Sequence, residues 1–328
     1  MILARAPLRI SFFGGGSDIP SYYKAGIGGV VSMAIDKYMH VAINTPEHNV
    51  YKIVYSQIET TSSINDIKHN IVRETLKKLT NPGKFEMSVF ADVPSKGTGL
   101  GSSSSLCVAL IRAMEKQLGC SYTKHEIAEL ASDIEINKCG EPIGKQDQYA
   151  ASFGGLNQYI FEPNGTTVVP INASSETISI LTHRGLLFYT GTQRKASDIL
   201  KHQFDNPEAN HWTRETVSMS HKARFLLEEG DVDSFIKMLD AGWEIKKLIN
   251  PYVSNSEIDD AYKEAKNLGV VGGKVLGAGG GGYLLLYPDL NHHNVGTIIE
   301  AMRQRGLKYY SFNMDTEGAK VVYNGTKF

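Results

Sequence analysis

The chain has 328 residues, 41 % of them apolar, which is enough to bury a sizeable core and suggests about two domains. Its 34 lysines and arginines nearly balance 35 aspartates and glutamates, so no overall field favours nucleic acid or an anionic membrane surface, and an anion needs a local site. Three cysteines without metal-ligand spacing argue against a disulfide framework or a structural zinc site. With no signal-peptide pattern and no long apolar run, the sequence predicts a cytoplasmic protein.

The first half of the chain mixes predicted strands with predicted helices. Strands are expected over residues 30–44, 48–55 and 85–91, and helices over residues 64–79 and 102–118. A further helix should begin at Thr123, which can form a capping box with Glu126, and should end at Glu135.

The second half changes character near residue 180. We expect, in order, a strand over 186–189, helices over 207–228 and 231–249, a helix capped by Ser256 that stops at Gly269, a strand over 283–287, a helix ending near Gly306, and strands near 308–312 and 319–323. Strands and helices do not alternate regularly, so the sequence predicts an α+β fold with domains over 1–180 and 181–328.

The most informative segment is P-S-K-G-T-G-L-G-S-S-S-S, residues 94–105, between a predicted strand and a predicted helix. Its glycines let the backbone approach a ligand closely, and the free N–H groups of a helix start favour an anion. Serine hydroxyls there can also bind Mg²⁺ associated with phosphate. The segment matches neither a Walker A loop nor the protein-kinase motifs, and a plain glycine-serine connector remains an alternative.

A second glycine-rich segment spans residues 272–282 and contains G-x-G-x-x-G at 277–282. A dinucleotide-binding turn would open a helix, whereas this one precedes a predicted strand. We therefore expect a hairpin whose N–H groups can still meet a phosphate, and we keep a dinucleotide-dependent oxidoreductase as an alternative function.

Three acidic residues are candidates for a site. Asp18 follows a predicted strand and three glycines, and Glu135 and Asp147 are 12 residues apart in the chain. A glutamate at a helix C-terminus opposes the helix dipole, which hints at a function for Glu135. Each of the three is also compatible with an ordinary turn or helix end.

Taken together and in this order, these segments resemble the GHMP kinases, the superfamily that contains galactokinase, homoserine kinase, mevalonate kinase and phosphomevalonate kinase. Motif 1 of the superfamily matches residues 9–18, motif 2, which ends in G-L-G-S-S, matches 94–103, and motif 3, G-A-G-x-G-G, matches 277–282. The resemblance implies an N-terminal domain like ribosomal protein S5 domain 2 and a ferredoxin-like C-terminal domain. It also implies a kinase that uses ATP and Mg²⁺.

The resemblance assigns roles to matched positions. Ser103 and Glu135 would hold Mg²⁺, and Asp147 would be the catalytic base or the anchor of the acceptor hydroxyl. The resemblance also places Arg9 near the reacting groups, and we expect Lys145, close to Asp147 in the chain, to be a second local cation. The ATP phosphates are expected at Pro94, Lys96, Gly97, Gly99, Leu100, Gly101, Ser102, Ser103, Ser104, Gly277, Gly279 and Gly280, and the sugar at Gly15, Gly16, Ser17 and Asp18.

Motif 1 departs from galactokinase, which has Glu-His where this chain has Gly15 and Gly16, and this disfavours galactose. The variant F-G-G-G-S-D-I-P-S-Y-Y resembles the branch that phosphorylates D-glycero-D-manno-heptose 7-phosphate on its anomeric O1 hydroxyl. A phosphorylated acceptor needs its own cation, and we expect Arg194 to bind that phosphate. A fucokinase-like or other sugar-1-kinase and a catalytically inactive sugar sensor remain alternatives.

Overall fold

A computed structural model describes residues 1–46, 48–79, 83–95, 97–193, 199, 208–289, 291 and 294–325. The strands in these residues are β1 (Ile2–Phe13), β2 (Gly28–Asn44), β3 (Tyr51–Val54), β4 (Ile58–Thr61), β5 (Glu86–Ala91), β6 (Leu156–Glu162), β7 (Gly165–Pro170), β8 (Leu186–Tyr189), β9 (Val270–Val275), β10 (Tyr283–Pro288), β11 (Lys308–Tyr310) and β12 (Lys320–Asn324). The α-helices are α1 (Pro20–Tyr23), α2 (Asn70–Lys78), α3 (Ser102–Leu118), α4 (Lys124–Ser132), α5 (Gln146–Phe153), α6 (Ser175–His183), α8 (Ala209–Glu229), α9 (Val232–Ile249), α10 (Ser256–Asn267) and α11 (Val295–Gln304). Shorter helical turns are η1 (Ile64–Asp66), the π-helix η2 (Asp133–Lys138) and η3 (Pro251–Val253).

The first sheet has the strand order β12-β1-β2-β5-β3-β4. Strand β6 also pairs with β2, and β7 pairs with β6. The long strand β2 makes this possible, because its first half pairs with β6 and its second half with β5. Helix α3 packs on β1 and β2 and buries Leu106, Leu110 and Met114, the apolar residues whose helical spacing predicted it. The start of α3 is thereby fixed beside the centre of the sheet.

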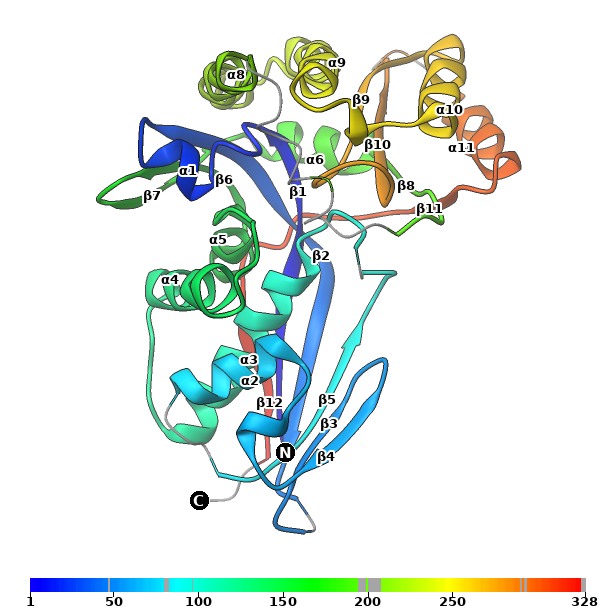
Figure 1. Ribbon diagram of the computed structural model, residues 1–328. Coiled ribbons are helices and arrows are strands. Elements are labelled where there is room, and N and C mark those ends of the chain that lie inside the picture. The colour runs from blue at the N-terminus through cyan, green and yellow to red at the C-terminus, as the bar shows by residue number, and fades with distance from the viewer. Residues whose placement is uncertain are drawn as a thin grey trace.

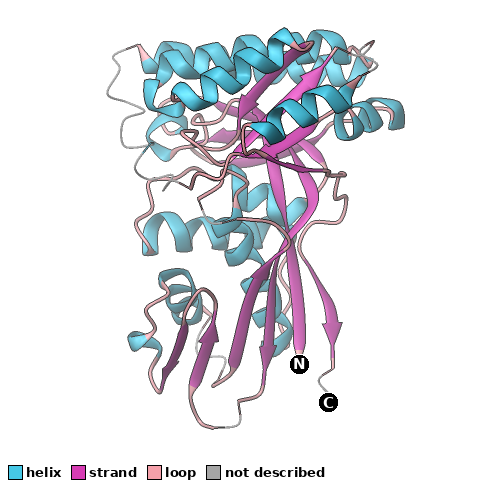
Figure 2. Cartoon of the chain, turned by 90° about the vertical axis from the view of Figure 1, so that its right-hand side faces the viewer, coloured by secondary structure: helices cyan, strands magenta, loops and turns pink. Residues whose placement is uncertain are grey.

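The second sheet is antiparallel, with the order β11-β8-β10-β9. It lies with α8, α9, α10 and α11 at one end of an elongated molecule, while the β3–β4 hairpin lies at the other (Figure 1). Figure 2, turned by 90°, shows the long strands of the first sheet running up to this helix-covered end. Helix α9 packs on β9, and α8 packs on β1 and β2, so this helical pair joins the two sheets.

The last strand does not belong to the second sheet. Strand β12 pairs with β1 in antiparallel register, from Ile2 opposite Asn324 to Arg5 opposite Lys320. A single division near residue 180 therefore does not separate the two sheets, because the predicted C-terminal unit, 181–328, contains a strand of the first sheet.

Two local predictions need correction. The predicted helix that begins at Thr123 has its capping box, but α4 continues as the π-helix η2, so Glu135 lies inside a wide turn and not at a helix end. The cap of α10 is Asn255, whose side chain accepts the Ile258 N–H, and Ser256 is the first helical residue. Within the described residues, no helix has the length and apolar character that crossing a membrane requires.

Candidate active site

The three glycine-rich segments meet at one pocket of about 700 Å³. The segments at Gly99 and Gly277 are in direct backbone contact, since a side chain on Gly277 would place its Cβ 2.3 Å from the Gly99 Cα. The turn of Gly14 to Gly16 lines another part of the same pocket. Helix α9 and strand β9 contribute the wall that comes from the C-terminal half.

The loop before α3 adopts a conformation that glycine favours. Gly97, Gly99 and Gly101 all have positive φ angles, of 66°, 81° and 77°. Gly101 is the N-cap residue of α3, and no side chain caps this helix start. The first backbone N–H groups of α3, at the end of the helix beside the pocket, therefore have no side-chain acceptor. Such an arrangement suits the binding of a phosphate.

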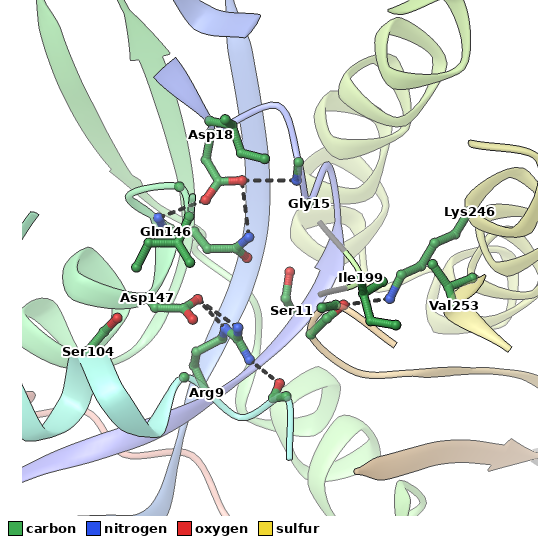
Figure 3. Close-up of a pocket in the computed structure, with 18 of the residues that line it drawn as sticks. Arg9, Ser11, Gly15, Asp18, Ser104, Gln146, Asp147, Ile199, Lys246 and Val253 are labelled. Atoms are coloured by element: carbon green, nitrogen blue, oxygen red, sulfur yellow. Dashed lines mark hydrogen bonds and ion pairs between the residues drawn. The ribbon is translucent and has the colours of Figure 1, made fainter. Parts of the chain in front are cut away.

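Asp147 and Arg9 form an ion pair in the pocket. Arg9, on β1, is only 4 % exposed and places both Nε and Nη2 2.7 Å from Oδ1 of Asp147, which lies in the first turn of α5. Its Nη1 donates to the Gly99 carbonyl over 2.5 Å. A Cβ on Gly101 would lie 3.2 Å from the Asp147 carboxyl, so this carboxylate sits directly against the start of α3. Figure 3 shows Arg9 reaching across to Asp147.

Glu135 is a fully buried carboxylate behind the start of α3. The π-helix η2 points it at Ser103, whose hydroxyl donates to Oε1, and at Gln148, whose Nε2 donates to Oε2 over 2.7 Å. Burial raises the pKa of Glu135 to about 7, more than these hydrogen bonds lower it. No cation among the described residues pairs with it, since the ion pairs recorded there do not include Glu135.

The oxygens near Glu135 fit a divalent cation. Mg²⁺ prefers hard oxygen ligands and commonly takes one or two from protein and the rest from phosphates and water. Ser103 and Glu135 offer a hydroxyl and a carboxylate, and the buried Oε1 of Gln148 has no hydrogen-bond partner. Within the described part of the chain no cluster of three or more His, Cys, Asp or Glu residues exists, so such an ion would need phosphate oxygens as well.

Asp18 ties the glycine turn to the start of α5. Its carboxylate, 2 % exposed, accepts the Gly16 N–H over 2.9 Å and the Gln146 N–H over 3.1 Å, and the Gln146 side chain adds a third bond of 3.2 Å. Burial raises the pKa of Asp18, and the negative charge of Asp147 adds to the effect, against the lowering by these backbone bonds. A side chain at Gly144 would collide with Asp18, because its Cβ would lie 1.9 Å from Oδ2.

Two lysines of the C-terminal half also line the pocket, and sequence reasoning missed both. Lys274, on β9, is 8 % exposed and donates to the Phe12 carbonyl over 2.6 Å. Lys246, on α9, donates to the carbonyls of Val275 and Gly277 over 3.0 and 2.6 Å. Burial, with the nearby charge of Arg9, lowers the pKa of Lys274 to about 7, and burial also lowers the pKa of Lys246 well below its usual range. The available signal for Lys274 was a lysine within the glycine-rich segment 272–282, beside motif 3.

Comparison with known proteins decides the family. The models for the GHMP kinases N terminal domain and the GHMP kinases C terminal region match residues 67–155 and 224–308. A D-glycero-alpha-D-manno-heptose 7-phosphate kinase of Campylobacter jejuni is 32 % identical, and the alignment covers 97 % of this chain and 98 % of that protein. The chain belongs to the GHMP kinases.

Solved structures of GHMP-like kinases share the fold. A putative sugar kinase from Campylobacter jejuni has a TM-score of 0.76 at 29 % identity, covering 98 % of this chain and 97 % of that one. A D-glycero-D-manno-heptose 1-phosphate kinase from Bacteroides thetaiotaomicron has a TM-score of 0.82 at 23 % identity, covering 99 % and 100 %. The two-domain α+β GHMP kinase fold predicted from the motifs is confirmed, and so is an ATP-dependent sugar kinase.

Most of the residues that the GHMP motifs singled out do line the pocket. They are Arg9, Gly15, Gly16, Asp18, Gly97, Gly99, Gly101, Ser102, Ser103, Ser104, Asp147 and Gly277. Segments as distant in sequence as β1 and the β9–β10 hairpin are thus brought together. The predicted hairpin at residues 277–282 is confirmed, because β9 and β10 pair in antiparallel register on either side of it.

Other singled-out residues of this GHMP kinase do not line the pocket. They are Pro94, Leu100, Ser17, Glu135, Lys145, Gly279 and Gly280. Leu100 is buried in the core, and the Ser17 hydroxyl holds the glycine turn by donating to the Gly14 carbonyl over 2.7 Å. Lys96 and Arg194 lie outside the described residues.

Lys145 is turned away from Asp147, although the two are close in sequence. Its ammonium lies 2.9 and 2.8 Å from the two carboxylate oxygens of Glu129 and 5.7 Å from the ring centre of Tyr23. The neighbouring Asp147 enters the pocket because α5 begins at Gln146, which rotates successive side chains about 100° apart. Arg9 is therefore the cation that contacts Asp147.

Proposed function

We propose that this GHMP kinase transfers the γ-phosphoryl group of ATP to the anomeric O1 hydroxyl of D-glycero-D-manno-heptose 7-phosphate. The observation that carries the proposal is the Asp147 carboxylate, held by Arg9 between the start of α3 and the glycine turn of Asp18. The choice of acceptor rests on the Campylobacter jejuni heptose 7-phosphate kinase, which aligns with nearly the whole chain.

The phosphate end of ATP would bind at the start of α3. Gly97, Gly99 and Gly101 hold the loop in positive φ, which brings backbone N–H groups close to a ligand. The helix N-terminus favours the negative charge, and Ser102 and Ser104 line the same part of the pocket. These groups would orient the γ-phosphoryl group toward Asp147.

Asp147 would accept the proton, or a hydrogen bond, of the acceptor hydroxyl. Two contacts from Arg9 fix the orientation of its carboxylate, which matters because a reacting hydroxyl must be aligned within a few tenths of an ångström. The positive charge of Arg9 would also stabilise the developing negative charge. Most of the rate enhancement would come from positioning and electrostatics, as is general for phosphoryl transfer.

Ser103 and Glu135 would hold Mg²⁺, with the free Oε1 of Gln148 at hand. When bound there, Mg²⁺ would supply positive charge that offsets the charge of the phosphates. Because Glu135 has a pKa of about 7, it must release a proton to become a good ligand. Gly15, Gly16 and Asp18 would form the acceptor side of the pocket, where the two glycines leave room for a sugar.

The test is an ADP-release assay with a panel of acceptors: D-glycero-D-manno-heptose 7-phosphate, the unphosphorylated heptose, L-fucose, D-galactose and no sugar. We expect heptose 7-phosphate to give at least a tenfold higher kcat/KM than the others, and phosphorus NMR of the product to show a second phosphate on the anomeric carbon. If fucose or the free heptose serves as well, the chain is a fucokinase-like enzyme. If ATP and sugar bind without ADP release, it is an inactive sensor.

A further inference from the structure

The C-terminal wall of the pocket carries two lysines that pair with no carboxylate among the described residues. Lys274 is more than nine-tenths buried and Lys246 is partly buried, yet in the part of the chain that the structure describes each makes hydrogen bonds only to backbone carbonyls. None of the ion pairs between described residues involves either lysine. A buried ammonium is normally paired, because removing its charge from water is costly.

The surroundings of Lys274 increase this imbalance. The charged groups that act on its ammonium are Arg9, from β1, and Lys246, from α9, and both are positive. Three carboxylates line the pocket, those of Asp18, Glu141 and Asp147. Arg9 already holds Asp147, and no ion pair recorded between described residues joins any of the three to Lys274 or Lys246. The Lys274 ammonium donates one N–H to the Phe12 carbonyl, so two of its three N–H donors are left for a ligand.

The position of Lys274 separates it from the phosphate loop. Phe12 lies at the end of β1, directly before the turn of Gly14 to Gly16 that leads to Asp18, so Lys274 stands on the acceptor side of the pocket. Lys246 bonds to Gly277, which touches Gly99 of the phosphate loop, and lies between the two sides. Figure 3 shows Lys246 across the pocket from Asp18 and Gln146.

We propose that Lys274, assisted by Lys246, binds the phosphate group that the acceptor already carries and so selects a phosphorylated sugar over a free one. The inference rests on the proposed function, since it assumes an acceptor with a phosphate. The phosphate loop and the start of α3 serve the ATP phosphates with N–H groups and hydroxyls. The two lysines provide the second anion site that a reaction with two phosphorylated substrates requires.

A binding site of this kind has a measurable signature. Without ligand, burial and two positive neighbours favour neutral Lys274, with a pKa of about 7. A phosphate dianion beside it favours the charged form, so the lysine takes up a proton when the acceptor binds. The signature distinguishes a lysine that contacts the phosphate from one that only supports the fold.

The decisive variant is Lys274→Met, which keeps the length of the side chain and removes its charge. We expect KM for heptose 7-phosphate to rise roughly 10- to 100-fold, with KM for the unphosphorylated heptose and for ATP changed less than about twofold. Lys246→Met should show the same pattern more weakly. Lys247→Met is the matched control, because Lys247 is the next residue on α9, is paired with Glu244 at 2.8 Å and does not line the pocket.

Calorimetry provides the second readout. Heptose 7-phosphate is titrated at pH 8 into the protein with a non-hydrolysable ATP analogue, in buffers with different ionisation enthalpies. The wild-type protein should take up close to one proton per acceptor bound, and Lys274→Met should take up far less. Thermal unfolding of each variant checks that it is folded. If Lys274→Met is not folded, the KM values and the proton uptake are measured on Lys246→Met instead.

The outcomes separate this inference from the proposed function. A wild-type enzyme that does not prefer heptose 7-phosphate over the free heptose overturns the proposed function and this inference with it. A wild-type preference that survives in folded Lys274→Met and Lys246→Met overturns the inference alone. The same holds if the variants raise KM for ATP and leave KM for heptose 7-phosphate unchanged, since the lysines would then serve the nucleotide.

Discussion

The two walls of the pocket handle charge differently. On the N-terminal wall, Arg9 holds Asp147, and Asp18 accepts three hydrogen bonds, so both carboxylates are satisfied without any ligand. On the C-terminal wall, Lys246 and Lys274 donate to backbone carbonyls and pair with no carboxylate among the residues that the structure describes. Side chains that are already paired are held in place before the substrates bind. The two lysines, in contrast, gain a partner of opposite charge when an anionic ligand binds.

Glu135 is a buried group of the same kind as the two lysines, but with a negative charge. It is a fully buried carboxylate that pairs with no cation among the described residues. Its pKa is raised to about 7, while the pKa of Lys274 is lowered to about 7. Paired charges therefore mark where the protein positions its own groups, and unpaired ones mark where an ion from outside completes the site. The following predictions can break or sharpen this distinction.

The largest effect is expected at the paired wall, from Asp147→Asn. The change keeps the size of the side chain and its ability to form hydrogen bonds. It removes the proton acceptor and the negative charge that pairs with Arg9. We expect kcat to fall ~10²–10⁴-fold, with binding of a non-hydrolysable ATP analogue changed only a few-fold. Steady-state kinetics measures kcat, and calorimetry measures binding of the ATP analogue. A variant that keeps more than half of the wild-type kcat would remove Asp147 from the chemistry.

Local sequence patterns predicted several elements of the fold well. Helix α3 was predicted from its apolar spacing, the Thr123 capping box from two residues, and the β9–β10 hairpin from glycines before an apolar run. These features depend on neighbours in sequence, which a pattern records. The family motifs likewise pointed to Arg9 and Asp147, and the structure brings the two into contact.

Contacts between segments that are distant in the chain could not be predicted in the same way. Lys274 owes its environment to Phe12, which is 262 positions away in the chain, and its burial depends on the packing of α9 against β9. The direction of Lys145 depends on Glu129 in a different helix, and the π-helix at Glu135 on how η2 packs against α2. Such contacts leave no periodic trace in the sequence.

The second effect concerns stability and pH. Because the folded state raises the pKa of Glu135 from 4.5 to about 7, it favours the protonated form. That stabilisation is present at low pH and is lost as pH rises from 4.5 through 7. In Mg²⁺-free buffer, the stability of wild type relative to Glu135→Gln should fall by roughly 2–4 kcal/mol between pH 4.5 and 8. Urea denaturation at each pH tests this, and parallel curves for the two proteins would contradict it.

The third effect is on Mg²⁺ itself. Glu135→Gln removes the charge that a divalent cation would balance but keeps an oxygen and the Ser103 contact within reach. We expect the Mg²⁺ concentration for half-maximal activity to rise about 10- to 100-fold at saturating ATP. The wild-type requirement should also fall as pH rises through 7, because Glu135 then ionises more readily. An unchanged titration would make Glu135 a structural residue only.

The smallest effect is expected from Lys145→Met. The sequence placed this lysine among the catalytic cations, but its ammonium is bound by both oxygens of Glu129, and Arg9 still holds Asp147 without it. We expect a loss of about 0.5–1 kcal/mol in stability, typical of a partly exposed ion pair, and a change in kcat below about fivefold. Lys78→Met is the matched control, because Lys78 pairs with Asp133 at 2.9 Å and neither residue lines the pocket. If Lys145→Met instead lowers kcat 100-fold or more while both variants lose the same stability, Lys145 acts on the reaction, and the paired wall extends beyond the groups that contact Asp147.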